Sequence, residues 1–274
     1  MQTEAELAEL ASPAVALSGA VLLGVSAAIA PGVVALVRRI WPGRNVFFAR
    51  WGFGHVIQAL LVFLLAQVAI ALVAPIEEIE DSILWLLGLS SLSFGCVVAF
   101  VLATARRLDP IGIASLGLRK GGNLRALFAG VAAYLLLLPA FFGAGLVWPW
   151  VLTLLGEPVE PQVFGELFGN AGTVELVGGI VLAVLVMPFF EELLYRGFLQ
   201  PLLVQNFRDR GGVVLTSVLF ALPHGASAFL PIFVLSLVLG GIMLRTQRLL
   251  AVWGLHALHN GLQLAILLGG GAIT

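Results

Sequence analysis

Long apolar runs are the feature that most limits how this 274-residue chain can fold. Runs of about 20 residues match the thickness of a bilayer's hydrocarbon core and predict membrane-spanning helices. Hydrophobic residues make up 60% of the chain and charged residues only 11%, whereas soluble domains carry about 25% charged residues. We therefore predict an all-α, polytopic transmembrane helix bundle of about eight spans, with residues 1–274 forming a single transmembrane domain. The predicted spans are 13–37, 52–74, 83–105, 124–147, 173–190 with an extension, 212–223, 228–244 and 249–269.

Charged residues between the runs predict how the chain is oriented. Loops that face the cytoplasm are enriched in Lys and Arg, and the basic residues fall in segments that follow the first, third, fifth and seventh spans. These are Arg38, Arg39, Arg44 and Arg50, then Arg106, Arg107, Arg119, Lys120 and Arg125, then Arg196, Arg208 and Arg210, then Arg245 and Arg248. After the second and fourth spans the chain is acidic, with Glu77, Glu78, Glu80 and Asp81, then Glu157, Glu160, Glu166 and Glu175. The alternation places both termini outside the cytoplasm. We expect a multi-pass protein of the cell membrane that has no nucleic-acid partner.

One cluster of ionisable residues ends the fifth span. Burying a charge at the bilayer centre costs about 2.5–3.5 kcal/mol on insertion scales, so such residues usually face a bundle interior or a water-filled cavity. Arg196 follows Glu192 by four residues, which allows the two side chains to pair on one helix face. Glu191 lies about 100° away around the helix and is free to face another helix. The alternative interpretation is an interfacial charge cluster that simply ends the span.

Two later spans carry histidines at membrane depth. His224 lies roughly 18 Å along its helix from the predicted cytoplasmic end, at about 1.5 Å per residue. If that helix ends at Pro223, His224 instead lines a re-entrant loop. In the eighth span the i, i+4 spacing directs His256 and Asn260 to one face. We interpret His259 as a packing or hydrogen-bonding neighbour and leave open whether it takes part in the site.

Three spans thus bring a carboxylate, an imidazole and an imidazole–amide pair to the same half of the bundle. This set suits peptide hydrolysis: a glutamate takes a proton from water, a histidine holds that water, and a second histidine and an amide stabilise the oxyanion. A zinc-dependent membrane metalloprotease is one alternative, because two histidines and a carboxylate can hold zinc. The chain lacks the His-Glu-x-x-His pattern that would supply two zinc ligands and a base together. A proton-coupled transporter or a non-catalytic scaffold is another alternative, since intramembrane Glu and His also build proton relays.

The three clusters together resemble the CAAX-processing and bacteriocin-processing (CPBP) family of intramembrane glutamic endopeptidases, which includes the CAAX prenyl proteases. That family carries E-E-x-x-x-R, F-x-x-x-H and H-x-x-x-N, in this order, on successive transmembrane helices. The matching segments are Glu191 to Arg196, Phe220 to His224 and His256 to Asn260. The resemblance places the catalytic helices within residues 173–269.

The resemblance also implies a role for each residue of the motifs. Glu191 is the expected general base, and His224 its partner on the catalytic water. The expected oxyanion hole is formed by His256 with Asn260. The supporting residues are Glu192 and Arg196. The resemblance implies no metal and no cofactor, and it implies a peptide or protein substrate at the membrane, as in eukaryotic relatives that trim prenylated CAAX proteins.

Overall fold

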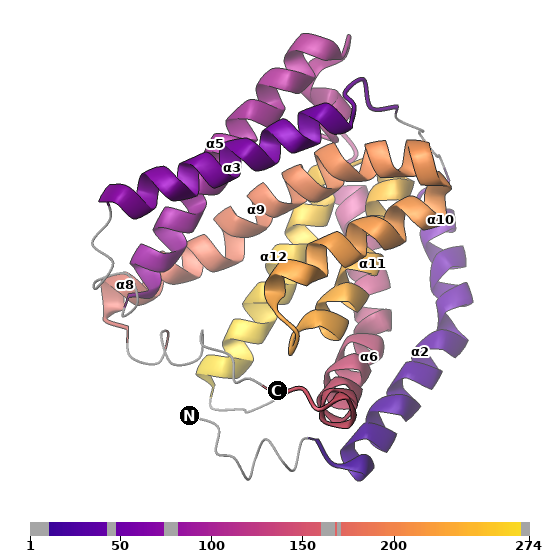
Figure 1. The fold of residues 1–274 in the computed structure, drawn as a ribbon. Coiled ribbons are helices and arrows are strands. Elements are labelled where there is room, and N and C mark those ends of the chain that lie inside the picture. The colour runs from indigo at the N-terminus through magenta and orange to yellow at the C-terminus, as the bar shows by residue number, and fades with distance from the viewer. Residues whose placement is uncertain (1–10, 43–47, 74–81, 160–167, 169–170, 270–274) are drawn as a thin grey trace.

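The computed structural model describes residues 11–42, 48–73, 82–159, 168 and 171–269. Within these residues the regular secondary structure is helical, which confirms the predicted all-α class. Figure 1 shows α3 against α5 on one side of the bundle and α2 against α6 on another. The α-helices are α2 (Pro13–Ile40), α3 (Phe53–Val73), α5 (Ile83–Leu108), α6 (Asn123–Leu155), α8 (Thr173–Val181), α9 (Met187–Glu192), α10 (Gln200–Ala221), α11 (Phe229–Thr246) and α12 (Leu249–Leu268). Shorter 3-10 or π-helical segments are η1 (Gly112–Leu116), η2 (Leu182–Val186), η3 (Leu193–Leu199) and η4 (Leu222–His224).

Seven of the described helices are long and apolar enough to cross a membrane, so the expected count of about eight is not confirmed. The difference lies in the 52-residue helical stretch Thr173–His224, which contains both the fifth and the sixth predicted spans. At Arg208 its backbone leaves the helical region, with φ 62° and ψ 173°. The chain reverses direction within α10 in Figure 1. Gly212 fits this reversal because a Cβ at that position would lie 2.4 Å from the Val204 backbone nitrogen.

Small residues allow α2 to approach α6 closely. A Cβ on Gly19 would lie 2.7 Å from the Gly143 carbonyl oxygen, and a Cβ on Gly143 would lie 2.7 Å from the Gly19 carbonyl oxygen. Close crossings at small residues are typical of helices that pack inside membranes, where van der Waals contact drives association. These glycines therefore attach the first span to the rest of the bundle.

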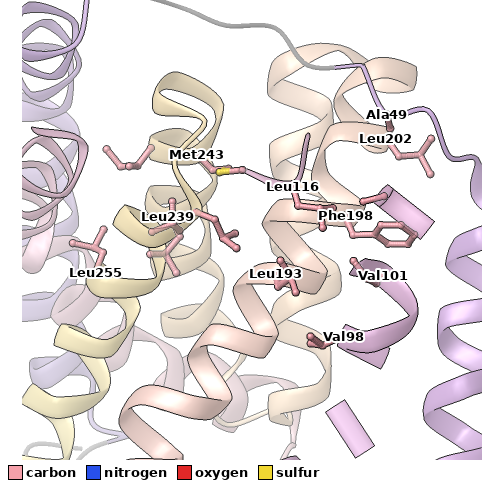
Figure 2. Close-up of a cluster of buried hydrophobic side chains, with 14 of the residues drawn as sticks. Ala49, Val98, Val101, Leu116, Leu193, Phe198, Leu202, Leu239, Met243 and Leu255 are labelled. Atoms are coloured by element: carbon pink, nitrogen blue, oxygen red, sulfur yellow. The ribbon is translucent and has the colours of Figure 1, made fainter. Parts of the chain in front are cut away.

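The π-helical segment η3 contributes side chains to a buried hydrophobic cluster (Figure 2). Leu193 and Phe198 of η3 belong to this cluster, together with Val101 of α5 and Leu239 of α11. Each of these four side chains is at most 1% exposed. The segment that follows Glu191 and Glu192 in the chain is therefore held by packing from both sides, which suits a site that needs fixed side chains.

The predicted orientation can be tested by labelling single cysteines in intact cells. Part of the prediction falls outside the described residues, namely Arg44, the acidic residues 77, 78, 80 and 81, Glu160, Glu166 and both chain ends. In a background with Cys96 replaced by serine, we expect cysteines at positions 119 and 245 to react only after the cell is permeabilised. A cysteine at position 157 should react with an impermeant reagent in intact cells, because acidic connections are predicted to lie outside. The opposite labelling pattern would contradict the orientation.

Candidate active site

Two π-helical segments flank the pair Glu191 and Glu192. A π-helical turn shifts the backbone hydrogen bonds from the i−4 to the i−5 carbonyl, and such turns often mark functional sites. Carbonyl oxygens in η2 and η3 accept hydrogen bonds from side chains that belong to other parts of the chain. These bonds join Trp253 Nε1 to Leu185 O (2.8 Å), Asn260 Nδ2 to Ala183 O (3.0 Å) and Trp51 Nε1 to Phe198 O (2.8 Å). The unusual helix geometry around the carboxylates is therefore tied to α12 and to the segment that precedes α3.

Glu192 is completely buried and has a partner on each side of its carboxylate. The Arg196 Nε atom lies 3.4 Å from Glu192 Oε2, so the pairing expected from the i, i+4 spacing is confirmed. The other oxygen, Glu192 Oε1, lies 2.9 Å from His256 Nδ1 on α12. Arg196 is also completely buried, and its Nη2 donates to the Ser236 hydroxyl of α11 at 2.9 Å. A buried charge is tolerated when it is paired and hydrogen-bonded, and this network connects three helices.

Glu191 is the less engaged of the two carboxylates. Its side chain is 17% exposed, compared with 0% for Glu192. Glu191 Oε2 lies 3.8 Å from His256 Nε2, which is beyond hydrogen-bond length. His256 therefore stands between the two glutamates, with Nδ1 bonded to Glu192 and Nε2 facing Glu191. Of the two, Glu191 retains lone pairs that a water or a substrate can reach.

Phe220 brings His224 to the other motif residues through aromatic contacts. Its ring is buried, at 1% exposure, and its centroid lies 5.8 Å from that of His256 and 5.1 Å from that of His224. The Arg196 guanidinium carbon lies 4.3 Å from the centre of the same ring, in a cation–π contact. Within the described residues no hydrogen bond joins His224 to Glu191. The structure thus places the three motifs around one aromatic ring.

The helix that carries His224 ends at this residue. After α10, η4 forms one tight turn, and Gly225 then adopts φ 84°, a conformation that favours glycine. Of the two possibilities left open by the sequence, the helix therefore breaks before residue 225. His224 Nδ1 lies 2.9 Å from the Phe220 carbonyl oxygen. Because a carbonyl only accepts, Nδ1 carries the hydrogen, and a neutral His224 presents Nε2 as an acceptor.

Asn260 and His259 have partners outside the cluster of carboxylates. The Asn260 amide donates to Ala183 O in η2, which leaves one of its two N–H groups for another acceptor. His259 is buried, and its Nδ1 lies 2.8 Å from the hydroxyl of Tyr134 on α6. Its ring also meets Phe141 edge to face, at 4.4 Å between centroids. These contacts confirm the interpretation of His259 as a hydrogen-bonding and packing neighbour.

Several residues around the cluster are not predicted by the motifs. Ser236 and Tyr134 each interrupt an apolar run, and a polar side chain in a span often bonds to another helix. A polar residue in an apolar run therefore predicts a hydrogen bond to another helix, but it does not predict the partner. Ala183 takes part only through its carbonyl oxygen, for which a sequence carries no signal.

These features define a multi-pass membrane protein with a buried Glu–Arg–His cluster inside its helix bundle. Residues 173–262 match the family model described as type II CAAX prenyl endopeptidase Rce1-like. This match confirms the resemblance to the CPBP family. This family implies a protease of the CAAX type, that is, a peptide hydrolase that works in a membrane. The match includes Glu191, His224, His256 and Asn260, and residues 1–172 lie outside it. No curated protein and no solved structure matches the chain.

Metal binding was the main chemical alternative for this set of residues. Within the part of the chain that the structure describes, no group of three His, Cys, Asp or Glu side chains is arranged to hold a metal ion. Assay of metal-stripped protein tests the metal-dependent alternative directly.

Proposed function

We propose that this protein is an intramembrane endopeptidase in which Glu191 activates a water molecule to hydrolyse a peptide bond. The observation that carries the proposal is that two adjacent glutamates lie in different environments. Glu192 is fully buried with Arg196 and His256 bound to its two oxygens, whereas Glu191 is partly exposed and only approached by His256. Neighbouring carboxyl groups in different environments commonly divide acid–base and supporting roles between them.

In the proposed reaction, Glu191 removes a proton from a water molecule as the water oxygen attacks the carbonyl carbon of the substrate. His224 accepts a hydrogen bond from the same water through Nε2, the nitrogen that its Phe220 contact leaves available. The C–N bond of the substrate then breaks, and Glu191 returns its proton to the leaving nitrogen. General base catalysis of this kind is typically worth about 10²- to 10⁴-fold in rate.

The negative oxygen that forms during the attack requires hydrogen-bond donors. We assign this task to Asn260, through the N–H that does not bond to Ala183, and to His256 through Nε2. Because Nδ1 of His256 donates to the Glu192 carboxylate, Nε2 can donate only when the ring carries a hydrogen on both nitrogens, and this is the form proposed for the reaction. Donors that are already fixed in place stabilise a developing oxyanion without having to reorganise. The bond from Asn260 to η2 fixes its amide, and the bond from His256 to Glu192 fixes its imidazole.

Removal of Asn260 separates this proposal from a zinc-dependent mechanism. Asn260→Ala should lower kcat by about 10²- to 10³-fold with a smaller change in KM, because an oxyanion donor acts mainly in the transition state. An amide is a poor zinc ligand, so a metalloprotease would tolerate the same change. The measurement is kcat and KM on a cleaved peptide, with metal content determined for each variant. If Asn260→Ala keeps the wild-type kcat, Asn260 is not part of the oxyanion hole.

The proposed substrate is a membrane-associated peptide or protein segment, and we place the protein in the cell membrane. A prenylated CAAX-like C-terminus is the specific class that the family match suggests. Incubation of the purified protein with matched prenylated and unprenylated peptides, followed by mass spectrometry, tests this assignment. We expect cleavage near the C-terminus that depends on the prenyl group. Cleavage of neither peptide, by a protein that is shown to be folded, would contradict the proposed activity.

A further inference from the structure

A group of arginines gathers around Trp41, away from the candidate active site. Trp41 caps the C-terminus of α2, and the guanidinium carbons of Arg125 and Arg248 lie 5.9 Å and 5.7 Å from the centre of its ring. Arg245 donates from Nε to Trp41 O and from Nη2 to Pro42 O, both at 3.1 Å. The three arginines come from the start of α6 and from the junction between α11 and α12. Three positive charges therefore meet at the end of one helix.

Among the described residues, these guanidinium groups retain unused donors and have no carboxylate in an ion pair with them. Each guanidinium has five N–H groups, and Arg125 donates from Nε to Ile40 O at 2.7 Å. Arg248 Nε is buried without a hydrogen-bond partner among the described residues. Within the same residues, none of the arginine–carboxylate pairs involves Arg125, Arg245 or Arg248. The backbone carbonyl partners carry no net charge, so the mutual repulsion of the arginines is only partly offset.

Crowding of like charges extends to Arg119 in the segment before α6. Burial and, secondarily, the positive charge of Arg248 lower the pKa of Arg119 from its usual value. A phosphate-type anion would relieve this repulsion and would accept several N–H groups at once, a geometry for which arginine is well suited.

We propose that Arg125, Arg245 and Arg248, gathered around Trp41, bind the phosphate group of an anionic phospholipid. The neighbouring surface favours a lipid over free phosphate. Leu124 and Phe128, on the first two turns of α6 beside Arg125, are 83% and 64% exposed, which offers a path for an acyl chain. Tryptophan and arginine at the ends of spans are typical of the headgroup level, and the predicted orientation puts this end at the cytoplasmic leaflet, where anionic lipids carry a negative surface potential.

The test uses the intact protein in nanodiscs of phosphatidylcholine that contain increasing amounts of brominated phosphatidylglycerol. Bromine quenches tryptophan fluorescence, and the difference between wild type and Trp41→Phe isolates the signal of Trp41. We expect phosphatidylglycerol to quench Trp41 at a lower mole fraction than brominated phosphatidylcholine does. In the double variant Arg125→Gln/Arg248→Gln, the apparent affinity for phosphatidylglycerol should fall by about 30-fold, because two arginines near an anionic headgroup are lost.

The matched control is Arg106→Gln/Arg107→Gln, which removes the same charge from an exposed pair at the end of α5. This control should keep the wild-type lipid preference. Equal quenching of Trp41 by the two lipids in the wild-type protein would overturn the proposal, and this comparison does not depend on the folding of the arginine variants. Equal loss in the control and cluster variants would show general attraction to the surface and would also overturn it. Displacement of the lipid by inorganic phosphate would identify free phosphate as the occupant in place of a lipid.

Discussion

Replacement of Glu191 by glutamine should lower kcat by about 10⁴-fold and leave the protein folded. The expected loss is at the upper end for general base catalysis, because glutamine cannot take the proton from the attacking water. The fold should tolerate the change, since the ion-pair contact of Glu191 within the described residues is the 3.8 Å approach of His256, and glutamine has nearly the same shape as glutamate. The loss should also exceed that of Asn260→Ala, which removes one of two oxyanion donors.

The measurement is kcat with each variant at saturating peptide, together with thermal unfolding in the same detergent. The combination of lost turnover and unchanged unfolding temperature is specific to a residue that acts in the chemistry. Activity of Glu191→Gln within about tenfold of wild type would contradict the assignment, because general bases normally contribute at least about 10²-fold.

Replacement of Glu192 by glutamine should instead destabilise the protein, by about 3–5 kcal/mol. Removing one partner of a buried ion pair leaves the other charge buried and uncompensated. Here the remaining charge is Arg196, which is fully buried and whose other contacts, among the residues that the structure describes, are the neutral hydroxyl of Ser236 and the face of Phe220. Activity should fall together with stability, because Glu192 also bonds to His256 Nδ1.

Glu191→Gln provides the matched control for this second prediction, since it makes the same chemical change one residue earlier. Unfolding in a denaturing detergent, followed by circular dichroism, should show a large loss of stability for Glu192→Gln and a small one for Glu191→Gln. Equal stability of the two variants, with equal loss of activity, would show that the two glutamates do not divide their roles as proposed.

Hydropathy predicted most of the bundle because each run of apolar residues has only one stable arrangement in a bilayer. The prediction was weakest between Phe190 and Gly212, where charged and polar residues suggested the end of a span. The structure continues as a helix here, because Glu192 and Arg196 find partners on α12 and α11. The reversal lies within residues 205–212, whose polar and Gly-rich composition is ordinary for a loop, but only Arg208 leaves the helical conformation. The two predicted spans are therefore helices that meet at this kink without an intervening loop.

The motifs predicted which side chains gather, but of the contacts between them they predicted only the pairing of Glu192 with Arg196. The spacing of Glu192 and Arg196 is a local property of a helix, and their pairing follows from it. The contact of His256 with both glutamates depends on how α12 packs, which no local pattern reveals. The partner of Asn260 is a backbone carbonyl in a π-helical turn, and neither the turn nor its free carbonyl has a sequence signature.

The most direct test of the central claim, that a glutamate activates the water without a metal, is peptide cleavage by metal-stripped protein. Purified protein is dialysed against EDTA, its metal content is measured, and its rate of cleavage is compared with that of Glu191→Gln treated in the same way. The account predicts that the stripped wild-type protein keeps its full rate and that the variant has almost none. Loss of activity on stripping, restored by stoichiometric zinc, would contradict it.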